Sequence, residues 1–364
     1  MQSEKIVGNT RENNFNIIRF VAAVMVVYGH MYHLIGSYPK PILGTAVSSI
    51  GVKIFFLISG YLILQSYLRD SNLVRYGIKR FFRIIPGLAG VVLFSIFVVG
   101  PLFTSLPLRD YFMDPSLKTY ARNILLFINY NLPGVFAENI YPNAVNGSLW
   151  SLPVEVFMYL MVPIVFFVFS KFNKKKTIIF CAIFCEIVNI ARQIFYPELR
   201  VVIYGSNVID ALALIPYFFV GMMFNFAEIK KYLNLQLATG IMIIGMMLDV
   251  NAIKGELILF FVLPYFIFSF AFVENPVFKK CFAKNDYSYG MYLYGFVVQQ
   301  MLVNKLAYLG FSLNVFMVIS TIATLVFAML SWHLIEKPCQ KIGKRLLKTS
   351  YVSKLKCREI SGVN

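Results

Sequence analysis

A series of apolar stretches, each close to the length of a membrane-spanning helix, constrains this chain more than any other feature. A helix needs about 20 mostly apolar residues to cross the hydrocarbon core of a bilayer. The sequence therefore predicts an all-α fold, a polytopic membrane helical bundle of about ten transmembrane helices. The predicted spans are Asn14–Leu34, Gly44–Gln65, Ile84–Thr104, Leu149–Ser170, Thr177–Tyr196, Asn207–Ala227, Tyr232–Asp249, Ile253–Val273, Tyr287–Leu306 and Leu313–Leu334.

The composition excludes most other classes of protein. Hydrophobic residues make up 59% of the 364 residues and charged residues 14%, whereas a soluble domain has about 45–50% and about 25%. A soluble surface cannot hide so many apolar side chains. The same figures exclude intrinsic disorder. The five cysteines are too few for a disulfide scaffold, and with the three histidines they show no metal-ligand spacing, so no metal is expected.

The net charge of +17 comes from 34 Lys and Arg residues against 17 Asp and Glu residues. In a soluble protein this excess would favour a nucleic-acid partner, but in a membrane protein it is typical of cytoplasmic loops. With the N-terminus inside, most basic residues fall in the inner segments. We therefore expect both termini to be cytoplasmic, membrane lipid around the bundle and no nucleic-acid partner.

The first predicted span contains two ionisable residues, Arg19 and His30, eleven positions apart. Eleven helical steps return to within about 20° of the starting direction and advance by about 16 Å, so both side chains lie on one stripe. Histidine can accept and return a proton near neutral pH, which makes His30 the candidate general base. The structural alternatives are an arginine that reaches the headgroups and a histidine that bonds to a neighbouring helix.

Two arginines before the third span, Arg80 and Arg83, are three positions apart and therefore neighbours on a helix. Paired guanidinium groups suit phosphate geometry, so a phosphate clamp is one interpretation. A positively charged membrane anchor is the other. Pro86 is expected in the first turn of the span that follows.

The fourth span opens with Ser148 and Trp150, and it contains Glu155 two turns further on. A tryptophan at the start of a span is typical of the membrane interface. A carboxylate inside the span could orient an imidazole or support proton transfer. Its alternative is a purely structural pair with Lys53 or Arg192. Lys53 itself is expected to reach toward the outer surface.

Other polar groups are weaker candidates. Glu186, Asp210 and the pair Gln299–Gln300 are expected to satisfy helix interfaces. The long segment Ser105–Ser148, predicted to lie outside, exceeds an ordinary turn and is expected to have a functional role.

Six short motifs follow one another along the chain. They are Arg19-x10-His30, Phe55-Phe-Leu-Ile-Ser-Gly60, Arg80-x-x-Arg83-Ile-Ile-Pro86, Gly147-Ser-Leu-Trp-Ser-Leu-x-x-Glu155, Asp286-Tyr-Ser-Tyr-Gly-Met-Tyr-Leu293 and Trp332-x-x-Ile-Glu-Lys-Pro338. With these motifs in this order, the chain resembles the integral-membrane acyltransferase-3 family, in the stand-alone form of its surface polysaccharide O-acetyltransferases. The resemblance covers most of the chain, from Asn14 to Pro338.

The resemblance implies a function. Members often move an acetyl group from cytoplasmic acetyl-CoA to an outward-facing sugar hydroxyl of a surface polysaccharide or lipid-linked glycan, in a bacterial cytoplasmic membrane. It implies an integral-membrane acyltransferase domain over 1–338, a basic cytoplasmic tail over 339–364 and no permanently bound cofactor.

The resemblance also assigns roles to the candidate residues. His30 matches the proposed catalytic histidine. Glu155 matches the outer motif, and its place inside the span is the reason that it is expected to act with His30 in catalysis. Arg19, Arg80 and Arg83 are expected to bind the acetyl-CoA donor. The members of the outer motif that are expected to contact the acceptor are Ser148 and Trp150.

The residues alone leave two other function classes open. A glycan or metabolite transporter or flippase without acyl chemistry would also need intramembrane charges. A structural or assembly subunit would tolerate the loss of His30. Within the enzyme reading, direct transfer and an acetyl-histidine intermediate both remain open.

Overall fold

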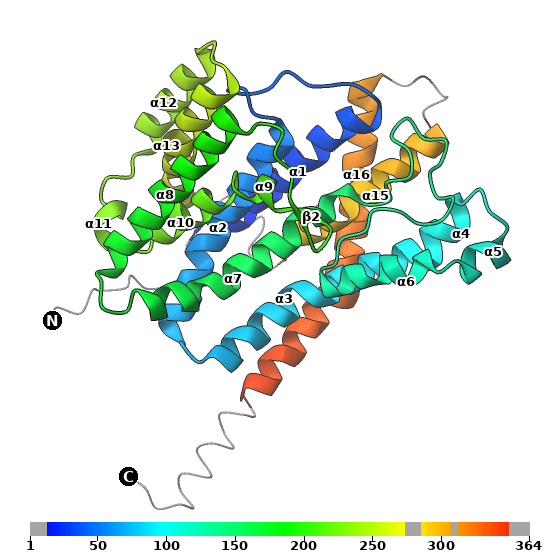
Figure 1. The fold of residues 1–364 in the computed structure, drawn as a ribbon, viewed down its shortest axis with the longest axis horizontal. Coiled ribbons are helices and arrows are strands. Elements are labelled where there is room, and N and C mark those ends of the chain that lie inside the picture. Colours follow the sequence, from blue (N-terminus) through cyan, green and yellow to red (C-terminus); the bar gives the residue numbers. More distant parts are fainter. Residues whose placement is uncertain (1–12, 274–284, 307–309, 311, 349–364) are drawn as a thin grey trace, which may run out of the picture.

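The structure, a computed structural model, describes residues 13–273, 285–306, 310 and 312–348. Within these residues the chain forms a bundle of helices, and its strands are a short antiparallel pair (Figure 1). The elements up to residue 195 are α1 (Phe15–Leu34), α2 (Val47–Arg69), α3 (Leu73–Phe94), the π-helix η1 (Ser95–Val99), α4 (Gly100–Phe103), α5 (Leu108–Met113), α6 (Ser116–Ala121), the 3₁₀ helices η2 (Arg122–Leu125) and η3 (Gly147–Trp150), α7 (Ser151–Val168) and α8 (Lys174–Phe195).

The second half of the chain continues the bundle. Its elements are β1 (Val202–Ile203), β2 (Ser206–Asn207), α9 (Val208–Ala211), α10 (Ile215–Met223), α11 (Ala227–Lys230), α12 (Leu235–Met247), α13 (Ala252–Ala271), α15 (Ser288–Leu306), α16 (Leu313–Ser331) and the π-helix η5 (Trp332–Glu336). After η5 the helix continues over residues 337–348, which we call the C-terminal helix. It therefore extends past the boundary predicted at residue 338, and 349–364 of the predicted tail lie outside the described residues.

The predicted all-α membrane fold is confirmed. Each of the ten predicted spans coincides with a helix, and seven helices among the described residues are long and apolar enough to cross a membrane. The segments Val208–Met223 and Leu235–Met247 are apolar but shorter. The ninth predicted span is α15, which is almost wholly buried and packs against α1, α3 and α16. Its glutamines are tolerated because neighbouring helices, not lipid, surround them.

The start of the third span differs from the prediction. The helix that contains it begins at Leu73 and continues to Phe103. Its first turn is capped by the side chain of Asn72, which accepts a hydrogen bond from the Arg75 amide (3.0 Å). Pro86 therefore lies inside α3 and not in its first turn. One consequence is that Arg80 and Arg83 belong to the same rigid helix as the span.

The segment predicted to lie outside, 105–148, is folded and bonded to α15. Asn139 Nδ2 donates to Gln300 Oε1 (2.8 Å), and Gln300 Nε2 donates to the carbonyl oxygens of Tyr141 and Ala144 (2.8 Å each). Gln299 Nε2 donates to the Val27 carbonyl oxygen on α1 (2.7 Å). The expectation that these glutamines satisfy helix interfaces is confirmed. In Figure 1, α4, α5 and α6 gather at one end of the bundle.

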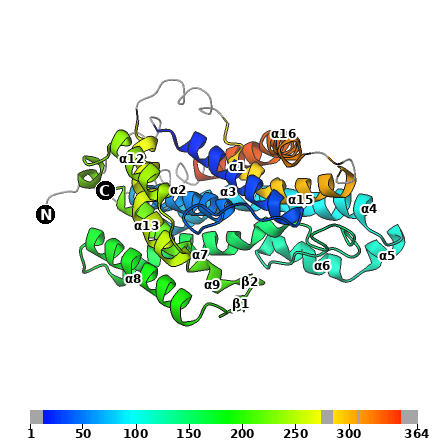
Figure 2. The ribbon, with the colours of Figure 1, turned by 90° about the horizontal axis from the view of Figure 1, so that it is seen from above.

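Helix α2 lies near the middle of the bundle, with α8 toward one side and α16 toward the other (Figure 2). It approaches α10 so closely that a Cβ at Gly60 would lie 1.9 Å from the Phe218 carbonyl oxygen, and one at Gly221 would lie 2.0 Å from that of Leu57. Small residues permit this close packing of helices in a bilayer.

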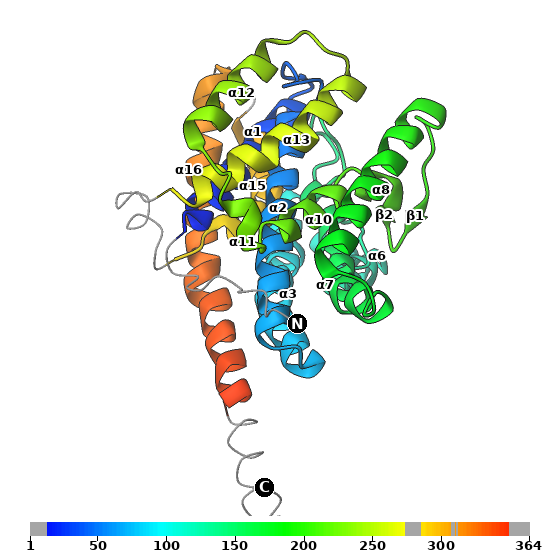
Figure 3. The same cartoon turned by 90° about the vertical axis from the view of Figure 1, so that its left-hand side faces the viewer.

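This packing overturns the prediction for Lys53. The lysine does not reach the outer surface. It is 2% exposed and forms an ion pair with Glu256 of α13. The Lys53 amine also lies 4.8 Å from the centre of the Tyr217 ring, and the Tyr217 hydroxyl donates to Glu256 Oε1 (3.0 Å). α10 and α13 cover α2 here (Figure 3), so the lysine has a carboxylate within reach and no path to water.

We expect Lys53→Met to lower the free energy of unfolding by about 3–5 kcal/mol, because it leaves the Glu256 carboxylate buried without its cation. The double variant Lys53→Met/Glu256→Gln should recover most of this loss, since the amide still accepts the Tyr217 bond. Thermal unfolding in detergent measures both. Lys175→Met, which breaks the exposed pair with Glu228, is the control and should change little. A double variant no more stable than Lys53→Met would contradict the argument.

Candidate active site

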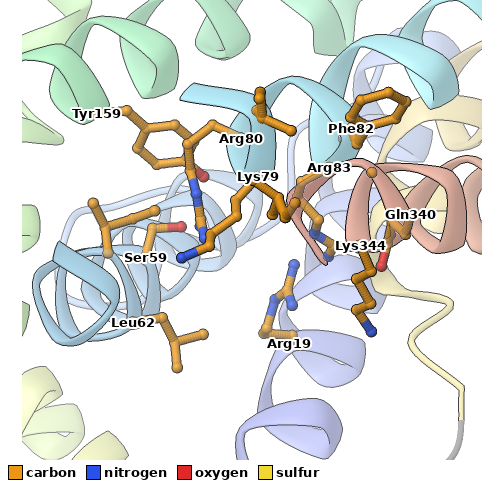
Figure 4. Close-up of a pocket in the computed structure, with 14 residues that line it drawn as sticks. Arg19, Ser59, Leu62, Lys79, Arg80, Phe82, Arg83, Tyr159, Gln340 and Lys344 are labelled. Carbon is orange, nitrogen blue, oxygen red and sulfur yellow. The ribbon is translucent and has the colours of Figure 1, made fainter. Parts of the chain in front are cut away.

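A pocket of about 360 Å³ lies where α1, α2, α3, α7 and the C-terminal helix meet (Figure 4). We call it the basic pocket, because five cationic side chains line it and no carboxylate does among the described residues. The cations are Arg19, Lys79, Arg80, Arg83 and Lys344. The three arginines expected to bind the donor are therefore brought together around one cavity. Lys79 and Lys344 were not predicted.

Arg19 and Arg83 share one carboxylate. Arg19 Nη1 lies 2.6 Å and Arg83 Nη2 2.8 Å from Asp286 Oδ2. A second carboxylate, Glu336 Oε2, lies 4.0 Å from Arg83 Nη1, and the Arg83 guanidinium lies over the Tyr289 ring at 5.4 Å. Glu336 is 1% exposed and ends the π-helix η5, a type of helix that often occurs at functional sites. The motif that begins at Asp286 and the motif that ends at Pro338 thus meet at Arg83.

The shared carboxylate is ionised at neutral pH. Burial by itself would raise the pKa of Asp286, which precedes α15 and lies outside the spanning segments. The adjacent Arg19 and Arg83 guanidinium groups, with hydrogen bonds from Ser288, outweigh this effect and lower the pKa to about 2. Asp286 therefore stays negative and neutralises part of the charge that its two arginines carry.

Arg80 is held differently from Arg83. Its Nη2 lies 3.5 Å from Ser66 Oγ, and its guanidinium lies 5.9 Å and 5.8 Å from the ring centres of Tyr76 and Tyr159. Within the described residues it has no carboxylate partner, and its buried Nε has no hydrogen-bond partner. Lys79, in contrast, is paired with Asp70 (3.0 Å). Arg80 is thus available to bind an anion that enters the pocket.

A second, narrower cavity adjoins the basic pocket, with which it shares Arg19, Arg83 and Tyr159. It holds about 40 Å³ and is lined further inward by Glu155, Ser151 and Tyr292 among others. We call it the polar passage. Its lining ends at Tyr292, whose hydroxyl donates to the carbonyl oxygen of Ser148, the residue that His30 contacts.

His30 meets Ser148, which was expected to contact the acceptor and not the imidazole. Ser148 Oγ lies 3.5 Å from His30 Nδ1, at the long limit of a hydrogen bond. The Ser148 carbonyl oxygen accepts from the Tyr292 hydroxyl (2.7 Å), and that hydroxyl lies 2.6 Å from Ser151 Oγ. The Phe296 ring stands edge-on to the imidazole at 5.4 Å. His30 is therefore at the far end of a chain of polar groups that begins in the polar passage.

The structure does not bring Glu155 to His30. The Glu155 carboxylate accepts hydrogen bonds from Ser59 Oγ (3.1 Å) and from the Tyr159 hydroxyl. These are not the alternative partners Lys53 and Arg192 either. The reason is axial spacing. Ser148 is level with His30, and Glu155 comes seven residues later, which on a helix is about 10 Å further along. Glu155 thus lines the polar passage near the arginines.

Trp150 follows Ser148 in the turn η3. Its side chain is partly buried against the core, and its carbonyl oxygen accepts from Ser206 Oγ (3.1 Å). Asn146 fixes this turn, since its side-chain oxygen accepts from the Ser148 amide (3.2 Å) and its Nδ2 donates to the Leu293 carbonyl oxygen (2.8 Å). The outer motif is therefore held rigidly against α15.

Sequence reasoning missed several residues of this region. Asp286, Glu336 and Tyr292 lie in motifs that were identified in the sequence. The motifs could have drawn attention to these residues, but they did not indicate which residues they contact. Lys344 and Tyr159 carried no such signal. Among the described residues, no group of three or more His, Cys, Asp or Glu residues has the geometry of a metal site.

Comparison with known proteins places this geometry in context. An acyltransferase domain profile matches residues 12–333. The chain is 29% identical to an O-acetyl transferase of Shigella phage Sf6 over 90% of this chain and 96% of that protein. It is 26% identical to Nodulation protein 10 of Rhizobium leguminosarum bv. viciae, over 92% and 95%. It is 28% identical to Peptidoglycan O-acetyltransferase OatA of Listeria monocytogenes, over 44% of this chain and 25% of that protein. No solved structure matches the chain significantly.

The ion pairs of Asp286 with Arg19 and Arg83 should contribute to stability. Asp286→Asn leaves Arg19 and Arg83 without their shared anion, so we expect the free energy of unfolding at neutral pH to fall by about 3 kcal/mol. Thermal unfolding in detergent measures this. The wild-type advantage should be present above the unfolded pKa of about 3.9 and should vanish as the pH falls toward 2.

The matched control is Asp70→Asn. Asp70 also contacts two cations, Arg75 and Lys79, but at a more exposed position. Its loss should cost less than about 1 kcal/mol. Equal losses for the two variants would show that the Asp286 bridge has no special weight.

Proposed function

The chain belongs to the acyltransferase family whose domain profile spans residues 12–333, and on that premise we propose that it transfers an acetyl group from cytoplasmic acetyl-CoA to a sugar hydroxyl. The acceptor is a surface polysaccharide or a lipid-linked glycan outside a bacterial cytoplasmic membrane. Two of the relatives are named as O-acetyl transferases, one of them of peptidoglycan. These names support acetyl as the donor group and a glycan as the acceptor.

One observation carries the proposal. The basic pocket lies at the Arg19 end of α1, and His30 lies about 16 Å away toward the other end. The polar passage extends from the basic pocket as far as Tyr292, whose hydroxyl bonds to Ser148 beside His30. Guanidinium and ammonium groups are suited to the phosphates of CoA. The thin pantetheine arm would follow the passage, which at about 40 Å³ must widen to admit it. The acceptor would then approach His30 from the opposite side, beneath the folded segment 105–148.

The chemistry then follows from His30. When Nδ1–H donates to Ser148 Oγ, the lone pair of Nε2 is free to accept a proton. The acceptor oxygen attacks the thioester carbon, and its proton moves to Nε2. The new ester C–O bond forms as the C–S bond breaks, and the imidazolium returns the proton to the CoA thiolate. Ser148 is a positioning residue, because it acts through the imidazole.

Glu155 has a different role in this proposal from the one its motif implied. Its carboxylate orders Ser59 and Tyr159 at the junction of the basic pocket and the polar passage. It is therefore a positioning residue for the donor arm. Trp150 and Ser148 stand at the acceptor side in the same proposal.

We expect His30→Ala to lower kcat for acetyl transfer by about 10²–10⁴-fold, because it removes the general base. CoA binding, measured by isothermal titration with the purified full-length protein, should persist. Transfer is followed with labelled acetyl-CoA and a surface-glycan extract. His33→Ala is the control, since His33 is on the same helix and faces Tyr38, and it should remain active. Full activity of His30→Ala would exclude the mechanism.

We expect Arg80→Gln to raise KM for acetyl-CoA by about tenfold or more with a smaller change in kcat, because a charge-assisted contact with a phosphate is lost. Steady-state kinetics over a range of acetyl-CoA concentrations measures this. Arg75→Gln is the control on the same helix, because Arg75 pairs with Asp70 away from the basic pocket. Equal KM values for wild type and Arg80→Gln would count against donor binding in this pocket.

A further inference from the structure

We propose that the C-terminal helix is a wall of the donor site, and that its Lys344 binds a phosphate of the acyl-CoA with Gln340 as a neighbouring donor. The inference rests on the proposed function, which it extends to a part of the chain that the motifs do not cover. The family profile ends at residue 333. Both side chains therefore lie beyond the family profile.

The C-terminal helix is fixed against α3. The helix that begins at Leu313 continues through η5 to Lys348, and it runs beside α3 in both Figure 1 and Figure 3. The contact is close, because a Cβ added at Gly343 would lie 2.8 Å from Cγ of Phe82. A glycine at this position thus lets the two helices approach, and the basic pocket lies beside the contact.

One face of this helix lines the basic pocket. The residues that do so are Gln340, Gly343, Lys344 and Leu347. Their spacing of three, four and seven positions is that of a single helical face. Figure 4 shows Lys344 and Gln340 on the same side of the pocket as Arg83, with Arg19 close by. A ligand that contacts the arginines would therefore meet this face.

Two polar side chains on this face have donors without partners among the described residues. Gln340 Nε2 is buried and has no hydrogen-bond partner in the described part of the chain. Lys344 has no carboxylate within ion-pair distance there, in contrast to Lys79 with Asp70 and Arg19 with Asp286. A buried donor without a partner is costly, so Gln340 Nε2 marks a place that something else completes. Lys344 is exposed, and its amine contributes a cation at the rim of the pocket.

The shared chemistry of these groups identifies the ligand. Arg80 and Lys344 offer only donors, both cationic, and Gln340 adds its unpaired Nε2 donor around the same cavity. An anion with several acceptor oxygens satisfies such a set, and a phosphate does so best. A lipid headgroup also carries a phosphate. We assign the site to CoA because the basic pocket adjoins the polar passage, which extends inward to Glu155 and Tyr292, whereas a lipid headgroup would need no such inner cavity.

The test measures CoA binding to the purified full-length protein by isothermal titration. We expect Lys344→Glu to weaken binding by more than tenfold, whereas Lys344→Arg should stay within about threefold of wild type. Gln340→Leu should weaken it about threefold. Lys341→Glu is the charge-matched control, because Lys341 is an exposed cation on the same helix that does not line the pocket. It should have little effect.

A second ligand identifies the phosphate. If Lys344→Glu weakens CoA but not dephospho-CoA, the lysine binds the 3′-phosphate. If it weakens both equally, it binds the diphosphate. Either result supports the inference.

Other results would overturn it. The inference fails if Lys344→Glu binds CoA with wild-type affinity, or if Lys341→Glu loses as much CoA affinity as Lys344→Glu. It also fails if Lys344→Glu only reduces the amount of anionic lipid that copurifies and leaves CoA affinity unchanged. If the wild type itself binds no CoA, the proposed function fails together with the inference. If the wild type binds CoA and the Lys344 variants bind it with the same affinity, the inference alone fails.

Discussion

The shared contact of Asp286 with Arg19 and Arg83 joins α1, α3 and the start of α15 at one end of the bundle. Two guanidinium groups this close would repel each other without an anion between them. The shared carboxylate therefore sets the positions of two of the arginines that line the basic pocket. It also leaves Arg80 and Lys344 as the cations that a ligand would engage. The proposed donor site depends on this division between neutralised and available charge.

Two buried charged centres in this protein differ in one respect. Lys53, Glu256 and Tyr217 satisfy one another between α2, α10 and α13. Such a closed centre stabilises helix packing, because unpaired charge is costly in a bilayer. The basic pocket has an excess of donors, with Arg80 Nε and Gln340 Nε2 left without partners among the described residues. That imbalance is the physical mark of a site for an anionic ligand.

The hydrogen bonds of the outer motif explain how His30 is oriented without a carboxylate. Asn146 fixes the turn that presents Ser148, and Tyr292 of α15 holds the Ser148 carbonyl oxygen. Ser148 in turn faces the imidazole. Neutral groups perform this task at one end of α1, while the charged groups gather at the other. This separation suits a reaction in which a charged donor and a sugar acceptor approach from opposite sides.

Local periodicity was enough to predict the helices, the common stripe of Arg19 and His30, and the adjacency of Arg80 and Arg83, because each depends only on the 3.6-residue turn. The family resemblance also led to the expectation that Ser148 lies on the acceptor side of the site. Local periodicity could not predict four other features. These are the partner of Lys53, the distance of Glu155 from His30, the position of Pro86 inside α3 and the face of the C-terminal helix that lines the pocket. Each is set by contacts between helices far apart in the chain, such as α2 with α13 or residues 340–347 with α3. Side-chain spacing within one helix fixes which residues share a face, but only packing decides what that face meets.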